Sequence, residues 1–138
     1  MTVFESSNGT PALPSDFTGL WINHDADGGR RELEFVGGKP HGRLRVILPN
    51  GVVQRECSLV KGQYHGEMTV RDAHGSILDV SSFDHGTGVY RIFMTGGQLG
   101  WEIHLRAGLR HGPRKRFDHR GGLLSVEQYV DDVLVSAE

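Results

Sequence analysis

Histidine is the residue type whose number and spacing suggest chemistry in this chain. Eight histidines occur among 138 residues, and three of them, His41, His65 and His111, share a Gly-x-x-His-Gly setting. If they sit on successive hairpins of one sheet, equivalent side chains lie two strands apart, which is about 9–10 Å. Two Zn–N bonds span only about 4 Å. We therefore predict no bound metal and interpret these histidines as turn residues that hydrogen-bond to the local backbone.

Familiar catalytic signatures are absent from the sequence. It contains no Gly-x-Ser-x-Gly, Cys-x-x-Cys or His-Glu-x-x-His motif. Cys57 alternates with apolar residues, which favours a small core residue over a nucleophile. No cofactor is predicted, and an enzyme is not the favoured interpretation. The alternative left open is a small enzyme of lyase, isomerase or cyclase type, in which Asp79 works with His104 or His65 as an acid–base pair.

The charge balance argues against a polyanionic partner. Lys and Arg total 15 against 17 Asp and Glu, a net charge of -2, so no global charge attracts nucleic acid or a membrane surface. The stretch from Arg106 to Arg120 is locally basic. We interpret it as a solvated edge hairpin whose cations pair across the sheet with Glu127, Asp131 and Asp132, and we expect no specific nucleic-acid binding.

Cysteine usage and hydropathy bear on location. A single cysteine cannot form an internal disulfide and fits a reducing compartment. No apolar run approaches the roughly 20 residues of a membrane helix, and the first residues lack the basic and apolar regions of a signal peptide. A cytoplasmic protein without a membrane span is expected.

Glycines define the elements that must position these residues. Gly19, Gly42, Gly66, Gly88 and Gly112 recur at intervals of 23, 24, 22 and 24 residues. Each is followed nine residues later by a second glycine: Gly28, Gly51, Gly75, Gly97 and Gly121. A fixed period of this size, held over five copies, indicates a repeat protein. We predict that each copy consists of a strand, a tight turn, a strand and a looser turn.

The second copy shows this pattern most clearly. Leu44, Val46 and Leu48 alternate with outward-facing residues, as in a half-buried strand. Asn50-Gly51 then predicts a hairpin with a primed turn, in which glycine supplies the positive φ. A looser turn over 61–66 leads into the next copy.

The predicted fold class is all-β. We expect a single repeat-built antiparallel meander of about five hairpins and about ten strands, twisted or curled into a trough. The repeat domain spans residues 17–130. An N-terminal lead-in or cap at 1–16 precedes it, and a C-terminal tail at 131–138 follows.

The Gly-x-x-His-Gly segments carry a family resemblance. They occur at 38–42, 62–66 and 108–112, each followed nine residues later by a turn glycine. This pattern resembles the MORN-type repeat, most closely its bacterial MORN-variant branch with YwqK-type antitoxin proteins. The resemblance covers about residues 17–130 and implies a trough-shaped binding scaffold. In several cases such a scaffold is the immunity or antitoxin partner of a toxin.

Stacking the copies places a mixed row of side chains on the predicted trough face. The return strands align Arg31, Arg55, Asp79, Trp101 and Ser125. The next row is Leu33, Cys57, Ser81, Ile103 and Glu127. Apolar rows flank both. Buried charge is costly unless paired, so the charges indicate either an ion-paired, partly wetted interior or a contact surface anchored by Arg55 and Trp101. The predicted binding residues are Arg31, Arg55, Asp79, Tyr90, Trp101 and Glu127.

These residues favour a protein-binding module. The expected partner is a toxin-like protein that the trough face occludes. A small molecule in the trough and a homodimer remain open alternatives.

Overall fold

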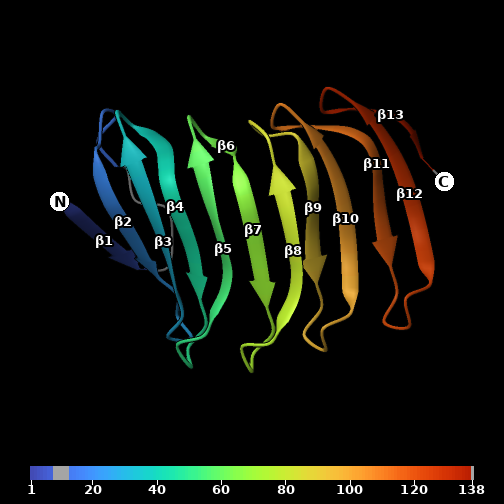
Figure 1. The fold of residues 1–138 in the computed structure, drawn as a ribbon, viewed down its shortest axis with the longest axis horizontal. Helices are drawn as coiled ribbons and strands as arrows, with labels where there is room; N and C mark the ends of the chain where they lie inside the picture. The colour runs from blue at the N-terminus through green and yellow to red at the C-terminus, as the bar shows by residue number, and fades with distance from the viewer. Residues whose placement is uncertain (8–12, 138) are drawn as a thin grey trace. The chain divides into compact units, whose positions relative to one another are not determined.

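A computed structural model describes residues 1–7 and 13–137 of the chain. These residues form thirteen β-strands and no helix, which confirms the all-β fold class (Figure 1). None of them therefore belongs to a helix that could cross a membrane. The chain divides into two compact units, Met1–Val80 and Ser81–Glu138. Residues 8–12 of the expected lead-in at 1–16 lie outside the described residues.

The first unit holds one sheet in which neighbours in sequence are neighbours in space. Its strands are β1 (Val3–Ser7), β2 (Gly19–His24), β3 (Arg30–Val36), β4 (Lys39–Ile47), β5 (Val53–Val60), β6 (Gln63–Tyr64), β7 (Gly66–Arg71) and the start of β8 (Ile77–Phe83). The order is β1-β2-β3-β4-β5-β7-β8, with β6 also paired to β5. Pairings from β2 to β7 are antiparallel, whereas β1 runs parallel to β2. The expected lead-in at 1–16 thus contributes an edge strand.

The second unit holds a five-stranded antiparallel sheet. Its strands are β9 (Gly88–Phe93), β10 (Leu99–Arg106), β11 (Leu109–Phe117), β12 (Leu123–Val130) and β13 (Val133–Ala137), in the order β13-β12-β11-β10-β9. Strand β13 lies in the segment predicted as a tail and pairs with β12. The strand pairings form two sheets, whereas the sequence predicts a single sheet. The connection from β8 to β9 carries an isolated bridge between Asp84 and Thr87.

The second glycine of every copy ends a hairpin turn. In copy two, the Gly51 amide donates to the Leu48 carbonyl at 2.9 Å, and the Leu48 amide donates to the Val52 carbonyl at 2.9 Å. The same two bonds recur in the other four copies. All five glycines have φ between 85° and 95°, so their predicted positive φ is confirmed. This geometry is a type I turn followed by a left-handed glycine bulge.

The primed turn predicted at Asn50-Gly51 is therefore wrong. A type I′ turn needs positive φ at both central residues, and Asn50 does not have it. The Asn50 side chain instead accepts the Val52 amide at 3.0 Å, which stabilises the longer loop.

The primed turns lie at the other end of the strands. Two consecutive residues with positive φ connect each hairpin to the next: Gly37 and Gly38, Lys61 and Gly62, His85 and Gly86, Ala107 and Gly108, and Asp131 and Asp132. The looser turn expected over 61–66 is thus a tight two-residue turn, because Gln63 and Tyr64 resume pairing with β5 at once. A break at His65 then separates β6 from β7, which begins at Gly66 with φ 85°.

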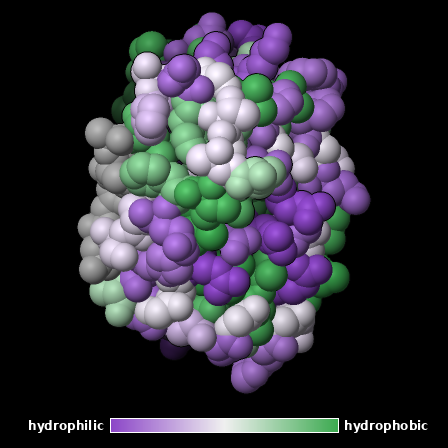
Figure 2. Space-filling model, turned by 90° about the vertical axis from the view of Figure 1, so that its left-hand side faces the viewer, coloured by the Kyte–Doolittle hydropathy of each residue, from purple (hydrophilic) through white to green (hydrophobic). Residues whose placement is uncertain are grey.

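Aromatic side chains close the β1 edge of the first sheet. Phe17 is 7% exposed and packs edge-on against Phe4 and Phe35, with ring centroids 6.2 and 5.9 Å away. The Trp21 indole donates to Ser6 Oγ at 3.0 Å, and Ser6 Oγ donates to the buried Asn23 amide oxygen at 3.0 Å. Viewed from this side, apolar atoms reach the surface among polar ones (Figure 2).

Candidate functional site

The motif histidines have a backbone role. His41 Nδ1 accepts the Lys61 amide at 3.2 Å, and His111 Nδ1 accepts the Asp131 amide at 3.3 Å. Each donor is the first residue of the next primed turn. The predicted bond to backbone is confirmed for these two histidines, but its donor lies 20 residues away in the next turn and is not local in sequence.

Two threonines perform the same task and were missed from the sequence. Thr18 and Thr87 precede Gly19 and Gly88, the position that histidine holds in the other copies. Their Oγ1 atoms accept the Gly37 amide at 2.9 Å and the Ala107 amide at 3.1 Å. If the copies are aligned on their first glycine, the threonines and the histidines fall at the same position. Both residue types present a hydrogen-bond acceptor at a similar distance from their own backbone.

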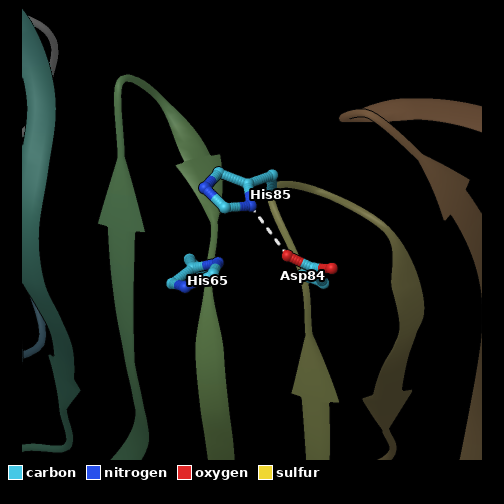
Figure 3. Close-up of side chains that lie close together, drawn as sticks. All are labelled: His65, Asp84 and His85. Atoms are coloured by element: carbon cyan, nitrogen blue, oxygen red, sulfur yellow. Dashed lines mark hydrogen bonds and ion pairs between the residues drawn. The ribbon is translucent and has the colours of Figure 1, made fainter.

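A local acid–histidine pair occupies the β8–β9 connection. Asp84 Oδ1 lies 2.7 Å from His85 Nδ1, and both side chains are largely exposed (Figure 3). His65, also drawn, belongs to the first unit and donates its backbone amide to the Ser58 carbonyl at 3.0 Å. The exposed pair joins residues adjacent in sequence, so we assign it no role beyond its turn.

The first unit brings two of the predicted binding residues into register. Strand pairing aligns Arg31 with Val46 and Val46 with Arg55, which confirms the Arg31–Arg55 part of the predicted row. Arg55 Nη1 contacts the Sδ of Met68, a side chain only 1% exposed, at 2.9 Å. Asp79 lies on β8 and is half-buried.

The second unit gathers the other predicted binding residues on one face. Trp101 aligns with Arg116 and then Ser125, one row of the sheet. The next row runs from Tyr90 through Ile103 and Arg114 to Glu127. We call this surface the ladder face and define it by Tyr90, Ile92, Trp101, Ile103, Arg110, Arg114, Arg116, Ser125, Glu127 and Tyr129.

Arginines and aromatic rings alternate along the ladder face. The Arg114 guanidinium carbon lies 4.7 Å from the Trp101 ring centroid and 5.6 Å from that of Tyr129. Arg116 lies 5.6 Å from the Trp101 ring, and Arg110 lies 4.4 Å from the Tyr129 ring. These distances are within the range of cation–π attraction. The contacts hold long, flexible arginines in place, which lowers the entropy lost when they bind a partner.

Carboxylates neutralise some of these arginines. Arg114 contacts Glu127 Oε1 at 2.7 Å through both Nε and Nη2. Arg110 donates to Asp132 Oδ1 at 2.9 Å, and Arg106 to Asp131 Oδ1 at 3.0 Å. The predicted pairing of the basic hairpin with these three acids is confirmed, but its predicted edge position is wrong, because β12 and β13 lie beyond β11 in the sheet.

The Arg110–Asp132 pair also shifts the titration of both partners. The hydrogen bond from the guanidinium lowers the pKa of Asp132 below its ordinary value, and the same bond raises the pKa of Arg110. Both groups are exposed, so the pair keeps its charge without much effect on stability.

A hollow opens at the turn end of the ladder face. Its volume is about 490 Å³, and it lies within the second unit. Its lining includes Ile92, Phe93, Met94, Trp101, Arg116, Phe117 and Leu124. The β9–β10 and β11–β12 pairings both shift register at this level. Such bulges redirect side chains and can open space between neighbouring strands.

The candidate acid–base residues do not all belong to one unit. His104 Nε2 lies 3.8 Å from Glu102 Oε1. Both alternate with Trp101 and Ile103 along β10, so they point away from the ladder face. His65 and Asp79 belong to the first unit.

Cys57 lies in the core of the first unit, as predicted. It is 4% exposed and forms no disulfide. Burial raises the pKa of its thiol to about 11, against the lowering effect of the nearby Arg55 charge. A thiol of this kind is a poor nucleophile at neutral pH.

Comparison with known proteins adds no assignment. A scan against protein-family models found no match, and a search of curated proteins found none either.

Proposed function

We propose that the protein is a binding module and that it binds a protein partner through the ladder face of its second unit. The observation that carries this proposal is the contact of Arg114 with both the Trp101 and the Tyr129 rings, to which Arg116 and Arg110 add one further contact each. Trp, Tyr and Arg are the residue types that dominate protein interfaces.

The exposure of the face supports a partner. Arg114 and Glu127 retain 26% and 24% side-chain exposure, so the centre of the face is accessible but already partly desolvated. Ile92 is 39% exposed at its edge. An apolar and aromatic surface rimmed by charge is the usual anatomy of a protein contact.

The finer assignment rests on the resemblance. The Gly-x-x-His-Gly copies suggest a MORN-type repeat protein of the bacterial variant branch. In that context the partner is a toxin-like protein and this chain its immunity or antitoxin protein. The single buried Cys57 agrees with a cytoplasmic location.

Face-specific crosslinking tests the proposal. The photoreactive residue p-benzoylphenylalanine replaces Ile92 on the ladder face or, as the control, Val126, whose partners Lys115 and Glu102 share the opposite face. In lysate of the encoding organism, the Ile92 probe should label one protein strongly and the Val126 probe should not. Trp101→Ala should reduce the labelling. Equal labelling from both faces would contradict the proposal, and a crosslink to a second copy would favour the homodimer.

A genetic test addresses the antitoxin assignment. The reading frame next to this gene is expressed alone and together with this chain. Growth arrest by the neighbour alone, relieved by co-expression and not by a Trp101→Ala chain, is the expected result. A neighbour without toxicity would remove the antitoxin assignment and leave the binding face untouched.

A further inference from the structure

Arg116 differs from Arg110 and Arg114, the other arginines of the ladder face, because no carboxylate in the part of the chain that the structure describes forms an ion pair with it. Arg114 faces Glu127 across the β11–β12 pairing, and Arg110 is paired with Asp132. The residue opposite Arg116 is Ser125. Within the described residues, Arg116 forms no ion pair and only stacks on the Trp101 ring. The row that holds Trp101 therefore carries one positive charge that the fold does not balance.

The unbalanced charge lies at the edge of the hollow defined above. Arg116 and Trp101 both line that hollow, whose other walls are mainly apolar or aromatic. Leu124, on its wall, is 55% exposed. Apolar side chains exposed around a concave site indicate a place for an apolar group. The hollow thus presents an apolar floor beside one available guanidinium.

One carboxylate also lines the hollow but is already engaged. Asp118 Oδ1 accepts the backbone amides of Arg120 and Gly122, each at 2.8 Å. These bonds lower the pKa of Asp118, with the bond from Gly122 having the largest effect. A ligand anion is therefore directed away from Asp118 and toward Arg116. This contrast fixes the orientation of an amphipathic ligand.

From this arrangement we infer that the hollow binds a large apolar side chain of the partner protein that is flanked by a carboxylate. The apolar side chain fills the space beside Trp101. The carboxylate takes the place that Glu127 has beside Arg114 and pairs with Arg116. This inference rests on the proposed function and names the chemistry of the partner at one point of the ladder face.

A pair of small probes separates charge from shape. N-acetyl-phenylalanine carries the apolar ring and a carboxylate, whereas N-acetyl-phenylalaninamide carries the ring alone. Titration of the full chain is followed by the two indole N–H signals in ¹H–¹⁵N spectra. The Trp101 signal should move with both probes, and the amide should bind about tenfold more weakly than the acid because it lacks the charge-assisted bond to Arg116. Trp21, hydrogen-bonded to Ser6 in the first unit, is the internal control.

Two variants test the role of Arg116. Arg116→Gln removes the charge, and Ser125→Glu supplies the missing cross-strand carboxylate within the chain. Each should weaken binding of the acid about tenfold, so that the acid loses its advantage over the amide. Lys115→Gln removes a neighbouring charge from the opposite face and should have no effect.

The outcomes distinguish this inference from the proposed function. Equal binding of acid and amide, or full binding by Ser125→Glu, overturns the inference. A Trp101 signal that does not move with either probe also overturns it. In each case the crosslinking result from Ile92 still decides on its own whether the ladder face binds a protein. Dispersed spectra of both variants show that they remain folded.

Discussion

Replacing His41 tests whether the motif histidines serve the backbone alone. The His41→Ala variant removes the acceptor for the Lys61 amide, a 3.2 Å bond to the first residue of a primed turn. That bond is largely exposed, so its loss should cost about 0.5–1.5 kcal/mol of unfolding free energy. His41→Thr restores an acceptor of the kind that Thr18 and Thr87 provide in other copies. It should recover at least half of the loss.

Urea unfolding followed by circular dichroism measures both variants. His74→Ala is the matched control, because His74 lies on the hairpin turn of copy three and its side chain is exposed. It should unfold at the wild-type urea midpoint. The backbone role would be refuted by a His41→Ala chain as stable as wild type. It would equally be refuted by a His41→Thr chain as unstable as the alanine variant.

Three further predictions follow from other sites. Because the folded pKa of Cys57 is about 11 against an ordinary 9.0, the contribution of this thiol to stability should be constant below pH 9 and fall between 9 and 11, where only the unfolded thiol ionises. Ellman's reagent at pH 8 should react slowly before denaturation and fast after it. Backbone hydrogen bonds, chiefly from Gly122, lower the pKa of Asp118. The stabilisation that the Asp118 carboxylate gives is therefore present above its ordinary pKa and lost in acid. In thermal melts, Asp118→Ala should destabilise the chain at pH 7 and have no effect at low pH. Arg116→Val, which introduces the residue that Val46 provides in copy two, should leave the melting temperature unchanged or raise it while crosslinking from the ladder face falls.

The sequence predicted the backbone better than the side-chain surface. Positive φ at Gly51 and its equivalents followed from spacing alone, because a left-handed residue is a local requirement that glycine satisfies best. The turn type did not follow. Asn50-Gly51 fits both a two-residue primed loop and a longer loop with a glycine bulge, and strand register decides between them.

The ladder face shows why the site was only partly predictable. Stacking the return strands correctly placed Trp101 and Glu127 in adjacent rows. The arginines of the outgoing strand were interpreted separately, as part of a solvated hairpin. In an antiparallel sheet the outgoing strand lies between two return strands, so Arg114 and Arg116 fall between Trp101 and Glu127. Periodicity within a copy cannot show contacts that arise only from this interleaving.

The two units use the same register for different chemistry. Leu44 and Val46 occupy, in copy two, the positions that Arg114 and Arg116 occupy in copy five. In the first unit, Leu44 lies between Leu33 and Cys57, and Val46 lies between Arg31 and Arg55, so neither position places a charge that needs a partner. The fold therefore tolerates leucine and valine at these positions. In copy five, Arg114 and Arg116 both add a desolvation cost, and only Arg114 offsets it with an ion pair to a described residue, Glu127. A charge that stability does not require, held against a tryptophan ring at the edge of an apolar hollow, is best explained by what it binds.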